Sequence, residues 1–105
     1  MRIVVLFNLK AGTDVAAYEN WVRTRDLPGV RSRVSVTDFQ IYRATGLLGS
    51  DARPPYQYVE IIDVESMEGF ARDLTSDAAR KIAEEFRGFA DNPQFILTEA
   101  LSEIG

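Results

Sequence analysis

The stretch that decides the fold covers residues 2–10 and reads Arg2-Ile3-Val4-Val5-Leu6-Phe7-Asn8-Leu9-Lys10. It is rich in β-branched and large apolar residues, which favour a β-strand. Side chains alternate between the two faces of a strand, so one face carries Ile3, Val5 and Phe7, while the other carries Val4 and Leu6. Because both faces are mostly apolar, we expect this strand to be covered on both sides.

Helical and extended patterns alternate along the rest of the chain. Apolar residues recur at helical spacing from Val15 to Arg25, and the run Asp-Leu-Pro-Gly at 26–29 predicts the end of that helix. A loop over 44–55 holds two glycines and two prolines and is too long for a tight hairpin. The remaining elements are expected as strands over 34–43, 56–64 and 94–101 and as helices over 66–74 and 77–89.

The order of these elements, β-α-β-β-α-β, is that of the ferredoxin-like fold. We therefore expect an α+β protein with a four-stranded antiparallel sheet and its helices on one face. The opposite face would be bare in a monomer, although it is predicted to be largely apolar. A second copy of the chain is the simplest cover, so we predict a homodimer whose two sheets face each other. The residues assigned to the covered face include Val4, Leu6, Val34, Val36 and Ile62.

Composition mainly excludes classes of function. The length of 105 residues predicts a single domain spanning 1–105. The chain contains no Cys and no His, which excludes disulfides, thiol nucleophiles, zinc–thiolate sites and the commonest general base. The net charge of −4 argues against nucleic-acid binding. The N-terminal apolar run is too short for a membrane span and lacks a signal-peptide cleavage site, so we expect a cytoplasmic protein without membrane contact.

Four arginines form a local exception to the acidic balance: Arg23, Arg25, Arg31 and Arg33 surround a predicted turn. They are interpreted either as a solvated rim that pairs with the acidic half of the chain, or as a contact for an anion or phosphate.

Five stretches carry a resemblance to a known family. They are residues 5–10 (Val-Leu-Phe-Asn-Leu-Lys), 18–21 (Tyr-Glu-Asn-Trp), 26–28 (Asp-Leu-Pro), 56–64 (Tyr-Gln-Tyr-Val-Glu-Ile-Ile-Asp-Val) and 89–99 (Phe-Ala-Asp-Asn-Pro-Gln-Phe-Ile-Leu-Thr-Glu). In this order and spacing the chain resembles the RedY-like, or HapK-like, proteins over essentially its whole length.

The resemblance implies a place in the dimeric α/β-barrel superfamily, in which two ferredoxin-like sheets face each other and the helices lie outside. Members occur with natural-product pathways of the prodigiosin type. The resemblance therefore implies a small aromatic ligand with a pyrrole- or indole-like ring. It provides no catalytic residues to carry over.

The predicted topology brings the ends of the first two strands and the start of the third to one end of the sheet, beneath the 44–55 loop. Alternation is interpreted as placing a polar cluster on the face away from the helices, inside the barrel. Polar groups in an apolar chamber are typical of a small-molecule pocket. Leu47 and Leu48 are predicted to bind the ligand as the loop closes. The polar cluster comprises Asn8, Gln40, Tyr42, Tyr56, Tyr58 and Glu60.

Within this cluster, Glu60 is the predicted catalytic acid or base. Without His or Cys, a base must be Asp, Glu, Lys or Tyr, and apolar surroundings raise a carboxyl pKa towards the useful range. Tyr58 is expected to donate a hydrogen bond, and Asn8 to orient a carbonyl or N–H group. The alternative is that Glu60 pairs with an Arg across the dimer or that this face is hydrated.

Other conspicuous residues receive structural interpretations. Tyr18 and Trp21 are predicted to be core residues, and Asp26 to brace a turn at the opposite end of the sheet from the cluster. No metal-ligand spacing and no glycine-rich phosphate loop appears, so neither a metal nor a cofactor is expected.

Three functions remain open from the sequence. The first is cofactor-independent acid/base processing of a pyrrole- or indole-like intermediate. The second is a non-catalytic protein that binds such an intermediate, and the third is a cofactor-free monooxygenase. Fold analogy alone does not choose among them.

Overall fold

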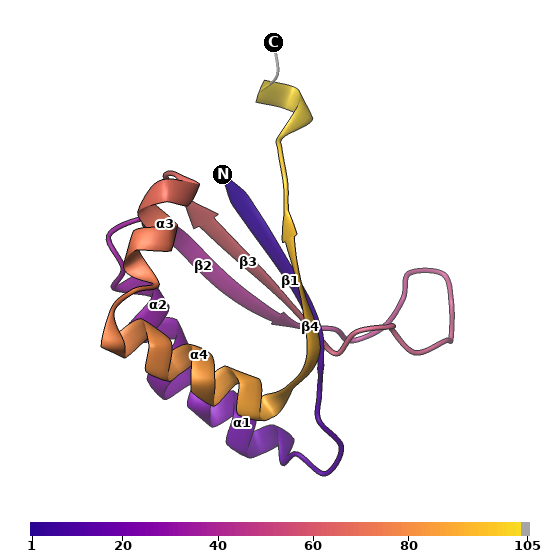
Figure 1. Ribbon diagram of the computed structural model, residues 1–105. Coiled ribbons are helices and arrows are strands. Elements are labelled where there is room, and N and C mark those ends of the chain that lie inside the picture. The colour runs from indigo at the N-terminus through magenta and orange to yellow at the C-terminus, as the bar shows by residue number, and fades with distance from the viewer. Residues whose placement is uncertain (104–105) are drawn as a thin grey trace.

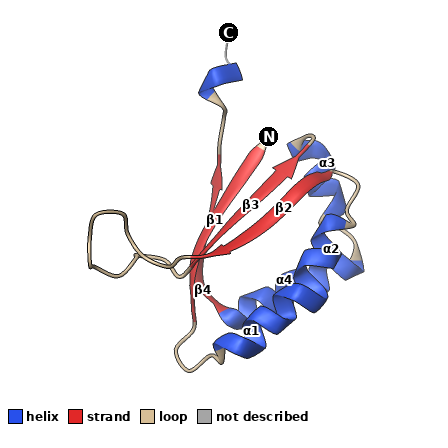
Figure 2. Ribbon diagram, turned by 180° about the vertical axis from the view of Figure 1, so that it is seen from behind, coloured by secondary structure: helices blue, strands red, loops and turns tan. Residues whose placement is uncertain are grey.

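The structure, a computed structural model, describes residues 1–103. Four strands form one sheet in the order β2-β3-β1-β4, and every neighbouring pair is antiparallel. Helices cover one face of this sheet and leave the other face open (Figures 1 and 2). The predicted α+β ferredoxin-like fold is confirmed. The strands are β1 (Arg2–Leu9), β2 (Val36–Arg43), β3 (Tyr58–Val64) and β4 (Ala90–Leu97).

The helical layer differs from the prediction at its first segment. The chain passes from α1 (Val15–Trp21) through a π-helical turn, η1 (Val22–Asp26), directly into α2 (Leu27–Arg31). The prediction that residues 26–29 end the helix was therefore wrong. Pro28 lies in the first turn of α2, directly after the π-helical turn, where its missing N–H interrupts the helical hydrogen bonds without ending the helix.

The second helical segment agrees with the sequence pattern. It consists of α3 (Met67–Asp73) and α4 (Asp77–Phe89). The side chain of Ser66 accepts a hydrogen bond from the Gly69 N–H, and the side chain of Ser76 accepts one from the Ala79 N–H, so each serine caps its helix. A short helical turn, η2 (Leu101–Glu103), follows β4.

The edge strand β4 begins at Ala90, not at residue 94 as predicted. Asn92 adopts a positive φ of 45°, which Asn tolerates better than most residues. The pairing between β1 and β4 shifts register between Leu6 and Asn8. This irregularity lets a strand start at once after α4 despite Pro93, which sits at the edge of the sheet.

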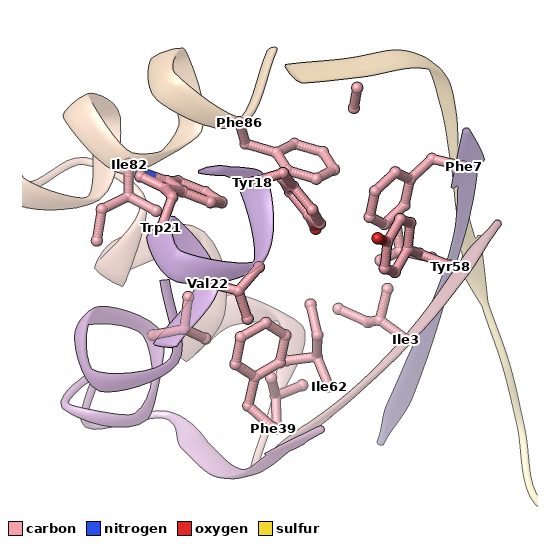
Figure 3. Packing of buried hydrophobic residues seen from close by; sticks show 14 residues of the cluster. Ile3, Phe7, Tyr18, Trp21, Val22, Phe39, Tyr58, Ile62, Ile82 and Phe86 are labelled. Carbon is pink, nitrogen blue, oxygen red and sulfur yellow. The ribbon is translucent and has the colours of Figure 1, made fainter. Parts of the chain in front are cut away.

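The two faces of β3 are assigned by its neighbours. Tyr58 pairs with Phe7 across the ladder, and the ring of Phe7 meets Phe86 of α4 edge-on at 5.0 Å between centroids. Tyr58 and Glu60 therefore point towards the helices, as Figure 3 shows for Tyr58. Their predicted place on the face away from the helices was wrong, and so was that of Ile62. Alternation shows which residues share a face but not which face the helices cover.

The core lies between the sheet and the helices (Figure 3). Tyr18 and Trp21 are buried there, as predicted, and Phe39 of β2 packs from the sheet side. The open face of the sheet carries half-buried apolar side chains at Val4, Leu6, Val59 and Ile61, together with the exposed Ile96 of the edge strand.

Val34 and Val36 depart from the predicted open face. Val34 precedes β2 and is exposed, while Val36 packs against the core cluster. Within residues 1–103, no helix combines the length and apolar character that crossing a membrane requires.

Candidate functional site

A cavity of about 350 Å³ lies between the sheet and the helices, at the end of the sheet where β1 begins and β3 ends. Its wall is apolar for the most part, with Ile3 and Ile62 from the sheet and Phe86 from α4. A volume of this size is in the range that small-molecule sites occupy. Three ionisable side chains interrupt the apolar wall: Asp26, Arg33 and Glu60.

Glu60 comes from the middle of β3, where its backbone pairs with Val5 on one side and Ile41 on the other. The residue is only 4% exposed, and its carboxyl makes no hydrogen bond or ion pair to any other residue within 1–103. Burial therefore raises the pKa of Glu60 well above its ordinary value, and the charge of Asp26 raises it further. Both effects favour the protonated form of this carboxyl more than in an exposed glutamate.

Asp26 reaches the same cavity from η1. It is 4% exposed, and its Oδ2 atom has no hydrogen-bond partner. Burial raises the pKa of Asp26 to about 7, although the nearby charge of Arg33 opposes the rise. The prediction that Asp26 lies at the opposite end from Glu60 was wrong.

A signal for Asp26 is present in the sequence. Tyr18, Val22, Asp26 and Val30 recur at intervals of four, and all four are buried. This spacing keeps residues on one helical face, so extending the pattern past residue 25 would have placed Asp26 inward. In the structure the helical segment does extend past residue 25, through the π-helical turn and α2.

Tyr18 adds a phenol to this region. Its hydroxyl is buried and lacks a hydrogen-bond partner. Burial raises the pKa of Tyr18 strongly, and the charge of Glu60 is the next cause. The phenol is therefore neutral throughout the working pH range, with a hydroxyl that could donate to a ligand or a carboxylate.

Tyr58 shares the face of Glu60, but its hydroxyl is already used. It donates to Glu19 Oε2 at 2.8 Å, and the guanidinium of Arg43 binds the same carboxylate. The Arg43 hydrogen bond is the main reason that the pKa of Glu19 falls to about 2. Burial and then the Glu19 contact raise the pKa of Tyr58 to about 12. Tyr58, Glu19 and Arg43 thus form a hydrogen-bonded network that links β3, α1 and β2.

Asn8 holds the long loop between β2 and β3. Its Nδ2 donates to the Pro55 carbonyl at 3.1 Å, and its Oδ1 accepts from the Gln57 N–H at 2.9 Å. Both halves of the amide are therefore occupied by the loop, so Asn8 does not orient a ligand in the cavity.

The other predicted ligand-binding residues lie elsewhere. Gln40 and Tyr42 are on the open face of the sheet, and Tyr56 is in the loop just before β3. Leu47 and Leu48 are exposed on the loop, which projects away from the body of the protein (Figure 1). No residue of 44–57 lines the cavity that contains Glu60. The structure therefore brings together Glu60 and Asp26, not the predicted cluster.

The acidic residues of the described chain do not gather into a metal centre. Within residues 1–103, no three Asp or Glu side chains come close enough together to hold a metal ion.

A ferredoxin-like sheet with a cavity beneath its helices defines the structural class of this protein. Its sequence gives the family: the profile of the REDY-like protein HapK matches residues 1–101. The chain belongs to the REDY-like HapK family. Comparison with curated protein sequences gives no significant match.

Three solved structures illustrate the shared fold. HapK from Hahella chejuensis is 23% identical with a TM-score of 0.72, and the alignment covers 95% of this chain and 94% of that one. SnoaB from Streptomyces nogalater, a cofactor-independent oxygenase, is 16% identical with a TM-score of 0.71 over 97% and 96% of the two chains. A dimeric ferredoxin-like protein from Thermobifida fusca is 14% identical with a TM-score of 0.70 over 90% and 85%.

Proposed function

We propose that the protein binds a small aromatic molecule in the cavity between sheet and helices and transfers a proton to or from it, with Glu60 as the acid or base. The ligand class is the pyrrole- or indole-like intermediate that the family resemblance implies, in natural-product biosynthesis of the prodigiosin type. The observation that carries the proposal is the pair of buried carboxyl groups, Asp26 and Glu60, in an otherwise apolar cavity.

The chemistry follows from the surroundings of these two groups. An unpaired buried carboxyl is costly to keep for stability alone, since an apolar residue would pack there without desolvation. Raised pKa values bring both groups towards neutrality, where a carboxyl can accept and return a proton. Asp26 disfavours the ionised form of Glu60 by its own charge, so Asp26 tunes the base while Glu60 exchanges the proton. This proton transfer needs no cofactor.

A small test compound that reacts whenever a base removes its proton can show whether Glu60 acts as a base. Nitrobenzisoxazole opens when a base removes its ring C–H proton: the C–H electron pair forms the nitrile and the N–O bond breaks to give a coloured phenolate. We expect the protein to accelerate this reaction, with a rate that rises with pH as Glu60 ionises. Glu60→Gln should lower the rate by about two to four decades, the usual worth of a positioned acid or base.

Two further variants separate the roles. Glu84→Gln removes an exposed carboxylate of α4 by the same change and should leave the rate unaltered. Asp26→Asn removes the charge that raises the pKa of Glu60, so it should move the pH–rate profile to lower pH. A full rate in folded Glu60→Gln would remove Glu60 from the mechanism.

A cofactor-free oxygenase is the second candidate, and the likeness in fold to SnoaB, itself a cofactor-independent oxygenase, is the observation that favours it. An electron-rich ligand in the same cavity would then react with oxygen after Glu60 removes a proton. Oxygen uptake on addition of the pathway intermediate distinguishes this function from proton transfer alone. Binding with neither turnover nor uptake indicates a carrier.

We also propose that the protein is a homodimer joined through the open face of the sheet. Val4, Leu6, Val59 and Ile61 give this face an apolar centre. The Thermobifida fusca relative of the same fold is dimeric, which supports the proposal. The cavity lies on the opposite side of the sheet from this proposed interface.

A further inference from the structure

Arg33 lines the same cavity as Glu60 and Asp26, yet its guanidinium is unpaired. Within residues 1–103 it makes no hydrogen bond and no ion pair. The negative charges of Asp26 and Asp73 act on it, but neither carboxylate forms an ion pair with it within the described residues. One oxygen of the Asp73 carboxylate already has hydrogen-bond donors: Oδ2 accepts from the Ser35 N–H at 2.9 Å and from the Ser35 hydroxyl.

The other arginines of the predicted cluster behave differently. Arg23 pairs with Glu19, and Arg25 forms two hydrogen bonds to Glu85. Arg31 donates to the carbonyl of Phe39. Of these three, only Arg25 pairs with the acidic half of the chain, as the first interpretation expected. Arg33 alone of the four turns to the cavity with its donors free.

A half-buried guanidinium against an apolar wall discriminates between anionic groups of a ligand. Its planar fork of N–H donors matches a carboxylate in a bidentate pair, and loss of water around it strengthens that pair. A dianion such as phosphate fits less well, because the negative charges of Asp26 and Asp73 already act on this guanidinium. The local charge favours a single negative charge on the ligand.

We propose that the ligand of this cavity carries a carboxylate that binds Arg33, while its aromatic body lies along the apolar wall towards Glu60. This inference rests on the proposed function, since it concerns the same cavity. It assigns the ligand to the class of small aromatic carboxylic acids.

The neighbouring carboxyls couple this binding to protons. Asp26 and Glu60 line the cavity with Arg33, and the charge of Asp73 also acts on Arg33. The charges of Glu60 and Asp26 in turn act on the buried phenol of Tyr18. An anionic ligand is repelled by ionised Asp26 or Glu60, so it binds best when both are protonated. Because the pKa of Asp26 is about 7, affinity for a carboxylate should fall as the pH rises through neutrality. Asp73, whose pKa is lowered mainly by its hydrogen bonds to Ser35, stays ionised throughout this range.

Benzoate and benzamide provide a matched pair of probes, because they have nearly the same shape and only benzoate is charged. Calorimetric titration at a pH of about 6 should show tighter binding of benzoate. Arg33→Met should weaken benzoate binding by roughly tenfold or more, as expected for a charge-assisted hydrogen bond, and leave benzamide within about threefold. Arg33→Lys, which keeps the charge but not the fork, should give an intermediate loss for benzoate.

The experiment has a matched control variant and defined outcomes that would overturn the inference. Arg87→Met removes an exposed arginine of α4 and should change neither affinity. Equal affinity for the two probes, or a benzoate affinity unchanged in both Arg33 variants, overturns the carboxylate inference. Indole tests the proposed function separately. If indole binds while benzoate gains nothing from Arg33, only this inference fails. If none of the three compounds binds, both fail.

Discussion

Asp26 and Glu60 are buried against one cavity although the first lies in a π-helical turn and the second in the middle of a strand. Neither carboxyl forms an ion pair within residues 1–103, and burial raises the pKa of each. The two groups also oppose each other's ionisation, so their titrations are coupled. A protein that needed only a stable core would gain by replacing them with apolar residues. Their presence is the clearest mark of function in this fold.

The first prediction concerns stability against pH. Asp26 has a pKa of about 7 in the folded protein against an ordinary value of 3.8, so the folded state binds the proton more tightly. Its contribution is fully present below a pH of about 4 and is lost as the pH rises to about 7. Glu60, whose pKa is also raised, acts in the same direction. We expect the free energy of unfolding to fall between about pH 5 and about pH 8.

Asp26→Asn should flatten this fall and leave the variant more stable than the natural protein at the higher pH. Urea unfolding at fixed protein concentration measures the effect. Carboxylates with lowered pKa values, such as Glu19 and Asp63, lose their contribution only at lower pH and leave this window undisturbed. An equal fall in the variant and the natural protein would contradict the assignment.

The second prediction concerns the packing of α2 on α4. A Cβ added to Gly29 would lie 2.2 Å from Ile82 Cδ1, which is far inside van der Waals contact. Gly29→Ala should therefore turn the Cδ1 end of Ile82 towards the cavity, and because that end is flexible we expect a cost of only about 1 kcal/mol or less in unfolding free energy. Gly88→Ala is the matched control, because a Cβ at that helical position meets nothing within 4 Å. Thermal unfolding should show Gly29→Ala less stable than Gly88→Ala, and Gly88→Ala equal to or above the natural protein.

The third prediction concerns the loop between β2 and β3. Asn8→Asp keeps the acceptor for the Gln57 N–H but removes the donor to the Pro55 carbonyl and adds a negative charge. Amide hydrogen exchange in residues 44–57 should accelerate, while exchange in β1 and β3 stays slow. Asn20→Asp, on the exposed side of α1, serves as the control. Unchanged exchange in the loop would mean that its other hydrogen bonds suffice to hold it.

The fourth prediction concerns the dimer. Leu6→Glu places a charge in the centre of the open sheet face, opposite Val59 of β3. Buried in an interface, that charge would be costly, so we expect sedimentation to show a monomer with unchanged secondary structure. Val34→Glu, at an exposed position before β2, should leave the dimer intact. If the natural protein at micromolar concentration sediments only as a species of 11.8 kDa, the open face does not join two copies.

The sequence by itself determined the order of the elements and the core residues of the first helix. Helical spacing placed Tyr18 and Trp21 inside, and alternation identified the strands, because both signals depend only on local geometry. Composition determined which chemistry is available: without His or Cys, a buried acid or base in this chain falls to Asp, Glu, Lys or Tyr.

Only the tertiary structure decided which groups meet. Alternation gives two faces of a strand but does not say which one the helices cover, so Glu60 and Tyr58 were assigned to the wrong side. The chain stays helical through a π-helical turn into α2, so Asp26 lies on the buried helical face where the sequence suggested an end. Both groups of the Asn8 side-chain amide form hydrogen bonds to the loop backbone, at Pro55 and Gln57. These residues lie 47 and 49 positions further along the chain. The face of β3 and the contacts of Asn8 depend on packing between distant segments, which no local pattern encodes, whereas the position of Asp26 follows from a helical spacing that continues past residue 25.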